Sequence, residues 1–218
     1  MPEMPDDLPP NEPVFNAPWP AVMLLILTVG GYGVQTLVDT GQLLPHWGAT
    51  AQALAAGRPE TLITAMFLHG GWAHALMNGA FGLAFATPVA RYFGTKAKGL
   101  MGFALFYIVC GGLANLAFVL AHGSSLAPLV GASGAVSALA AAAARILAGR
   151  GEVGPITSPL VIGMGAGWII TNLITAITGF TPGAGGASVA WQVHLVGFGL
   201  GLVLIDVVGR WSRPARGD

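Results

Sequence analysis

Charged residues and cysteine are both scarce in this sequence, and each scarcity excludes a class of protein. Lysine, arginine, aspartate and glutamate together make up 8% of the 218 residues, whereas a soluble domain carries about 25%. Too few charges remain to cover a soluble domain, so that class is excluded. Cys110 is the one cysteine and lies in an apolar run. It excludes a fold held by disulfides and favours a packed structural thiol.

A basic amino-terminal stretch is also missing. Residues 1–17 are rich in proline and carry the acidic residues Glu3, Asp6, Asp7 and Glu12, unlike the positively charged start of a secretory signal. This composition predicts a short disordered tail. We therefore expect the first apolar run of the chain to be retained.

Hydrophobic residues are abundant, at 54% of the chain, and they gather in long runs. A helix that crosses a hydrocarbon core of about 30 Å needs about 20 of them. Breaks rich in Ser, Pro, Gly and Arg separate the runs. Six runs qualify as spans: 19–38, 74–93, 100–121, 133–149, 158–178 and 190–209. The sequence therefore predicts an all-α membrane protein, a six-transmembrane-helix bundle with one domain over residues 18–210.

The lysines and arginines predict how this bundle is oriented. With six spans both termini share one side of the membrane, and only Arg58, in the connection 39–73, lies on the other side. The remaining basic residues are Arg91, Lys96, Lys98, Arg145, Arg150, Arg210, Arg213 and Arg216. Cytoplasmic loops carry such an excess, so the tails 1–17 and 211–218 are expected to be cytoplasmic. The connection 39–73 then faces outward, and its apolar residues predict that it lies partly in the membrane interface.

Polar side chains inside the spans are candidate functional residues, because an ionisable or amide group in lipid is energetically unfavourable. Their depth follows from the helical rise, counted from the nearest cytoplasmic arginine. Ser133, His194 and His74 come out about 26, 24 and 26 Å deep, and Asn78 about 20 Å deep on the same helix face as His74. Three separate spans are thus expected to bring these four residues to one layer near the outer surface. Further polar residues within the spans are Asn115, Asn172 and Gln192.

Asp206 does not belong to this layer. It follows His194 by 12 residues, which places it about 18 Å closer to the cytoplasmic end of the span. We expect it to cap a helix or to form a salt bridge with Arg210. A Ser/His dyad without an acidic partner remains.

Ser133 and His194 predict nucleophilic catalysis. A serine hydroxyl becomes nucleophilic when a neutral histidine accepts its proton. The stretch Gly131-Ala132-Ser133-Gly134 starts a helix, where free N–H groups and the helix dipole favour a developing oxyanion. His74 and Asn78 supply side-chain donors at a similar depth. Taken singly, each residue is explained by helix capping or packing, but capping and packing require no common layer.

Close approach of the fourth and sixth spans is also predicted. Small residues let membrane helices pack backbone to backbone. They lie on one face of each span: Ser137, Ala140, Ala141 and Ala144 below Ser133, and Gly197 and Gly201 below His194.

These motifs resemble those of the rhomboid intramembrane serine proteases from about Trp19 to Arg210. Gly131-Ala132-Ser133-Gly134 is similar to the family's G-x-S-G, and His194, Gly197 and Gly201 to its H-x-x-G-x-x-x-G. His74 and Asn78 resemble its H-x-x-x-N, which together with the N–H of Ser133 implies an oxyanion hole. His69 matches a further histidine, with an implied structural role. The resemblance implies a six-helix bundle without a cofactor that cleaves transmembrane segments of other proteins near their outer ends.

Two positions depart from the family pattern. Members commonly carry a Trp-Arg pair before the second helix, where this chain has Pro59-Glu60-Thr61. Many also have an aromatic residue four positions after the nucleophile, which stacks on the base; this chain has Ser137 there. His194 is therefore expected to be oriented less firmly, or by another ring such as Trp191.

Two other functions stay open. A catalytically inactive rhomboid-like adaptor would bind transmembrane helices without cutting them, although such a protein is expected to lack Ser133 or His194. A small transporter or channel is suggested by the polar residues of the middle spans, but these can equally hydrogen-bond between helices. They are Asn115, Thr171, Asn172, Thr175 and Thr178.

The sequence also bears on cofactors and partners. H-E-x-x-H is absent and Asp206 is the one carboxylate within a span, so neither a zinc protease nor an aspartyl protease is expected. The expected partners are transmembrane protein substrates and the lipid bilayer, with no nucleic acid and no metal. We expect a multi-pass protein of the cell membrane, and the composition fits a bacterial inner membrane.

Overall fold

A computed structural model of the protein describes residues 16–123, 127–179 and 190–213. The described residues form helices and loops with a few isolated β-bridges, which agrees with the predicted all-α class. Most of the expected tails 1–17 and 211–218 lies outside the described residues.

Six long helical segments follow the six predicted runs. The first is continuous through α1 (Trp19–Leu25), the π-helical turn η1 (Ile26–Gly30) and α2 (Gly31–Gln35). The others are α6 (Trp72–Phe93), α7 (Ala97–Ala121), α8 (Ser133–Ala148), α9 (Pro159–Thr178) and α10 (Trp191–Ser212). Among the described helices, α7, α9 and α10 are long and apolar enough to cross a membrane, judged by length and composition.

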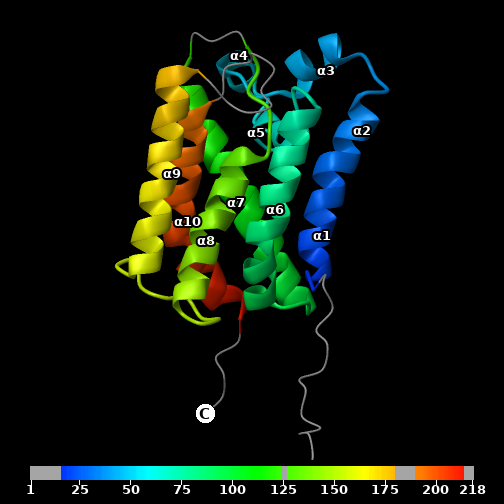
Figure 1. Ribbon diagram of the computed structural model, residues 1–218. Coiled ribbons are helices and arrows are strands. Elements are labelled where there is room, and N and C mark those ends of the chain that lie inside the picture. The colour runs from blue at the N-terminus through cyan, green and yellow to red at the C-terminus, as the bar shows by residue number, and fades with distance from the viewer. Residues whose placement is uncertain (1–15, 124–126, 180–189, 214–218) are drawn as a thin grey trace, which may run out of the picture.

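The connection 39–73 folds into short helices at one end of the bundle. They are α3 (Thr40–Trp47), α4 (Ala51–Ala55), α5 (Thr61–Thr64) and the 3₁₀ turn η2 (Ala65–Phe67). The side chains of Asp39 and Thr50 cap α3 and α4, as their residue types favour. We call the end that holds α3 and α4 the loop end; α1 begins and α10 ends at the opposite, terminal end (Figure 1).

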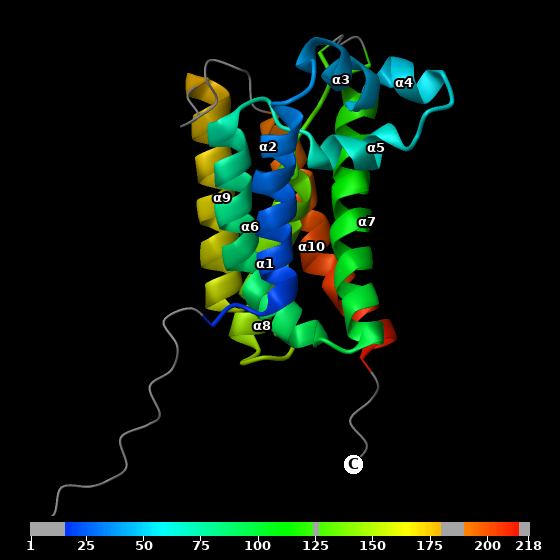
Figure 2. The same cartoon turned by 90° about the vertical axis from the view of Figure 1, so that its right-hand side faces the viewer.

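Part of this connection packs into the helix bundle. α5 lies across α7 (Figure 2), and Met66 is buried against Gly111 of α7. Asn115 of α7 donates a hydrogen bond of 2.8 Å to the Leu62 carbonyl oxygen. Met66 therefore packs into the bundle, because the glycine opposite leaves room for its side chain, while Phe67 and Trp72 stay exposed.

α8 is the central helix of the bundle. Every residue from Gly134 to Ile146 is buried, and α6, α7, α9 and α10 all pack against it. Its many alanines and its one glycine, Gly134, allow these four helices to approach closely. Around it the outer surface is apolar: α9 exposes most of its isoleucines and leucines and buries only Val161 and Asn172.

A buried arginine joins α8 to α10 near the terminal end. Arg145 donates to the Gly154 carbonyl oxygen at 2.8 Å and to the Leu202 carbonyl oxygen at 2.6 Å. It also forms an ion pair with Asp206. The expected salt bridge between Asp206 and Arg210 is therefore wrong, because Asp206 faces α8 across the helix contact.

Candidate active site at the start of α8

The loop before α8 is held tightly by backbone contacts. Leu129 and Ala49 exchange two hydrogen bonds of 2.9 and 3.0 Å, and the Gly131 N–H donates to the Ala65 carbonyl oxygen at 2.8 Å. Gly131 has φ of +119°, which strongly favours glycine. A Cβ atom there would lie 2.7 Å from Cε1 and Nε2 of His74. The His74 imidazole thus lies against the backbone just before Ser133.

Ser133 is the first residue of α8. The N-cap residue Ala132 provides no side-chain acceptor for the first N–H groups of the helix, so the positive end of the helix dipole is left uncapped by a side chain. One turn later, Ser137 donates to the Ser133 carbonyl oxygen at 2.7 Å. Ser137 occupies the position at which many rhomboid proteases have an aromatic residue. Its side chain therefore bonds to the backbone of its own helix, α8.

The start of α8 packs directly on α10. A Cβ atom on Gly197 would overlap the Gly134 carbonyl group, and one on Gly201 would overlap Ala138. The predicted close approach is present, and its nearest backbone contacts are at Gly134 and Ala138. Ala140 and Ala141, from the predicted face of α8, form one buried cluster with Phe198 of α10.

His194 lies beside this contact and is held by α9. Its Nδ1 is 2.8 Å from Oδ1 of Asn172, and no ring contact to His194 occurs among the described residues. The expectation that Trp191 orients the base is therefore wrong. Within the described residues no hydrogen bond joins Ser133 to His194, and catalytic hydrogen bonds of this type often tighten only when substrate binds.

His74 and Asn78 occupy the same face of α6. The Asn78 amide donates to the His74 carbonyl oxygen at 3.0 Å, and its side chain is buried. His74 and His194 lie near enough to interact electrostatically. The structure thus brings His74, His194 and the start of α8 together, with Asn78 one turn further along α6.

His69 is buried behind this group. Gln35 of α2 donates to the His69 carbonyl oxygen at 2.7 Å and accepts from the His69 N–H at 3.0 Å. The His69 ring packs edge-on against His74 with 5.1 Å between centroids. Burial, together with the neighbouring His74 charge, lowers the pKa of His69 to about 3, so this ring is neutral at physiological pH.

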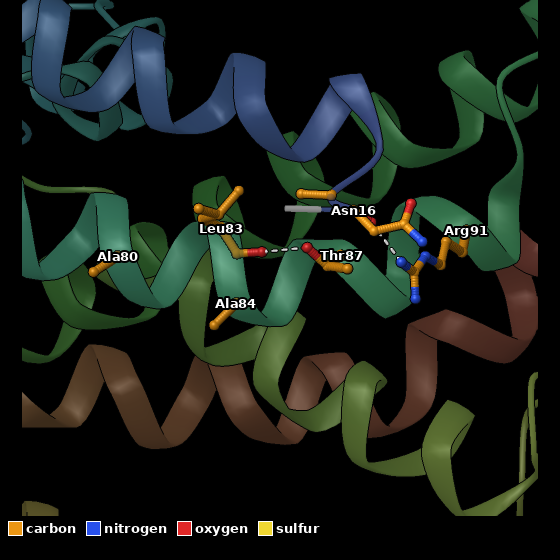
Figure 3. Close-up of a pocket in the computed structure, with 7 residues that line it drawn as sticks. Asn16, Ala80, Leu83, Ala84, Thr87 and Arg91 are labelled. Carbon is orange, nitrogen blue, oxygen red and sulfur yellow. Dashed lines mark hydrogen bonds between the residues drawn. The ribbon is translucent and has the colours of Figure 1, made fainter. Parts of the chain in front are cut away.

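Other polar residues and cavities lie apart from this group. Gln192 faces His122 at 3.4 Å. A shallow pocket at the start of α1 is lined by Leu83, Thr87 and Arg91 of α6 together with Asn16 (Figure 3). Thr87 there bonds to its own helix, so the pocket offers no nucleophile paired with a base. Among the described residues no cluster of His, Cys, Asp and Glu suits a metal ion.

Together, the apolar helices and the serine and histidines at the start of α8 define a helical membrane protein with a polar site inside its bundle. The profile of the Rhomboid domain matches residues 56–211, and the chain belongs to the rhomboid family. The match contains all four candidate site residues, Ser133, His194, His74 and Asn78. No curated protein sequence matches the chain significantly.

Asn172 is the residue of this site that sequence reasoning missed. It was recognised only as one polar side chain among several in the apolar spans. The signal was a lone amide in the middle of an apolar run, which called for a buried partner.

Proposed function

We propose that the protein is an intramembrane serine endopeptidase that cleaves transmembrane segments of other membrane proteins. Ser133 is the nucleophile and His194 the general base. The observation that carries this proposal is the contact of Gly197 with Gly134. It supports the pairing because Ser133 and His194 lie beside it on adjacent helices. Membership of the rhomboid family supports the reaction class.

The chemistry follows from the neutral imidazole. As the Ser133 oxygen attacks the substrate carbonyl carbon, Nε2 of His194 takes the hydroxyl proton. The same proton then passes to the leaving amine as the peptide C–N bond breaks, which leaves an ester on Ser133. A water molecule, activated by His194, hydrolyses this ester and restores the free serine.

The negative charge of the tetrahedral intermediate needs donors that are already in position. The N–H of Ser133 is one, since no side chain caps the start of α8. His74 and Asn78 are the proposed side-chain donors. One N–H of the Asn78 amide stays available after the other donates to His74, because a primary amide carries two.

The proposed membrane arrangement has six spans with both termini in the cytoplasm. The start of α1 and the end of α10 share the terminal end (Figures 1 and 2), which is compatible with an even number of crossings. Arg91, Arg150 and Arg213 come together in one surface pocket next to the end of α10, as expected for a cytoplasmic face. The site then lies toward the outer face of a cell membrane, which in a bacterium is the inner membrane.

The test compares cleavage of a single-span substrate in vesicles by wild type, Ser133→Ala and His194→Ala. Matched controls are Ser158→Ala, which alters another helix-start serine without a capping hydrogen bond, and His46→Ala, which alters an exposed histidine of α3. We expect product only from wild type and the two controls. Equal amounts of product from wild type and both site variants would overturn the proposed serine protease activity. Substrate retained without product by wild type would instead indicate the inactive adaptor.

A further inference from the structure

Asn172 is a buried amide on α9, a helix that is otherwise mostly apolar and exposed. α9 is the most exposed long helix of the bundle and buries only Val161 and Asn172 along its length. An amide in such an apolar helix is unfavourable unless its hydrogen bonds are satisfied. The described structure satisfies both ends of this amide, and each end has a different partner.

The hydrogen bonds of Asn172 determine which way its amide points. Nδ2 donates to the Trp168 carbonyl oxygen at 2.8 Å, and Oδ1 lies 2.8 Å from Nδ1 of His194. The reversed amide would set Oδ1 against the Trp168 carbonyl, and two acceptors repel each other. The Trp168 carbonyl therefore keeps Oδ1 directed at His194.

This orientation selects one tautomer of the imidazole. Because Oδ1 can only accept, Nδ1 of His194 carries the hydrogen. A neutral imidazole carries a single N–H, so Nε2 keeps its lone pair. That nitrogen is the one a general base uses to take the serine proton.

A second contact keeps α9 in register with α10. Trp168, one turn before Asn172, stacks on Phe198, one turn after His194, with 5.8 Å between ring centroids. Two successive layers, one polar and one aromatic, thus join the antiparallel helices. The hydrogen bond to His194 rests on a packed contact rather than on the amide alone.

We propose that Asn172 is the positioning residue of the base: it holds His194 as the Nδ1–H tautomer with Nε2 free for Ser133. This inference rests on the proposed protease function. It explains how the dyad works with Ser137 in place of a stacking ring. It also explains why the partner is an amide, because a carboxylate at this buried position would place a charge in the apolar interior of the bundle.

The test uses Asn172→Leu and Asn172→Asp, with Thr171→Ala as the matched control on the exposed side of the same helix. Leucine has a similar volume and suits lipid, so Asn172→Leu is expected to unfold at the wild-type temperature. Its kcat for the single-span substrate should fall by about tenfold to hundredfold, with KM unchanged. Asn172→Asp keeps the acceptor and should recover most of kcat. In a plot of kcat against pH, the loss of activity of Asn172→Asp toward acid should begin at a higher pH than in the wild type. The reason is that a negative charge beside Nδ1 favours the imidazolium.

Two results would overturn the positioning role. One is a wild-type kcat for Asn172→Leu, and the other is a loss of kcat matched by an equal loss of folded protein. A ¹⁵N spectrum of His194 in the wild type gives a readout independent of activity, and an Nε2–H tautomer there would also overturn it. If wild type itself gives no product dependent on Ser133, the proposed function has failed; if wild type cleaves and only these tests fail, the function stands without Asn172.

Discussion

The backbone of Gly197 in α10 touches the backbone of Gly134 in α8, with no space for a side chain between them. The proposed nucleophile, Ser133, directly precedes Gly134, and the proposed base, His194, lies about one turn before Gly197. Glycine at this position therefore sets the distance between the two reacting groups as well as the packing of the two helices.

Gly197→Ala is expected to separate α8 from α10. The added methyl group overlaps the Gly134 carbonyl group, and overpacking of this kind lowers the free energy of unfolding by about 1–3 kcal/mol. A misplacement near 1 Å lowers the rate by about 100-fold. Thermal unfolding in detergent and cleavage rate measure the two effects. Gly199→Ala is the control, because its Cβ would meet no atom within 4 Å; equal behaviour of the two variants would contradict the prediction.

Gly131→Ala is expected to disturb the site from the loop that precedes α8, where Gly131 lies against His74. Gly131 has φ of +119°, where an alanine is strained by about 1–3 kcal/mol, and its Cβ would lie 2.7 Å from the His74 ring. Reaction of Ser133 with a fluorophosphonate should slow by about tenfold or more, a loss of about 1.4 kcal/mol in transition-state stabilisation. Gly71→Ala serves as the control, since Gly71 is extended and has open space around it. Wild-type labelling of Gly131→Ala would refute the role given to His74.

Arg145→Met is expected to destabilise the bundle without touching the proposed chemistry. Arg145 supplies donors to Gly154, Leu202 and Asp206 while itself only 6% exposed. Removing one partner of a buried pair costs about 3–5 kcal/mol, and the value here is expected near the lower limit because Asp206 is partly exposed. The free energy of unfolding in detergent measures the loss.

The surface pair of Arg213 with Glu152 provides the comparison for Arg145. Glu152 is exposed, and such pairs contribute about 0–1 kcal/mol. Glu152→Gln should therefore change the free energy of unfolding far less than Arg145→Met. Similar losses from the two variants would show that burial of Arg145 is not the cause.

His69 is expected to make stability depend on pH. Burial lowers its pKa from 6.5 to about 3, so between these values the unfolded chain binds a proton that the folded chain does not. Stability is then complete above pH 6.5 and falls toward pH 3, by at most about 1.4 kcal/mol per pH unit. His69→Leu should flatten this slope, measured by unfolding between pH 7 and 4. His46→Leu, at an exposed site, should keep the wild-type slope.

The sequence alone determined where the helices begin and end along the chain. α8 begins at Ser133 as predicted, and the other five runs agree with the observed helices within a few residues, because a continuous apolar run in lipid must form a helix. Depth along each helix follows from counting residues at about 1.5 Å each. His74 of α6 and the backbone at Gly131, just before Ser133, lie against each other, as expected for residues of one layer.

Only the tertiary structure decided which faces of the helices meet. The rotation of a helix about its axis depends on all its neighbours, and a difference of one residue turns the contact by about 100°. Asp206 was therefore paired with Arg210 instead of Arg145, and Asn172 was not recognised as the hydrogen-bond partner of His194. Asn172 and His194 belong to different helices, and their pairing depends on how α9 and α10 are turned toward each other.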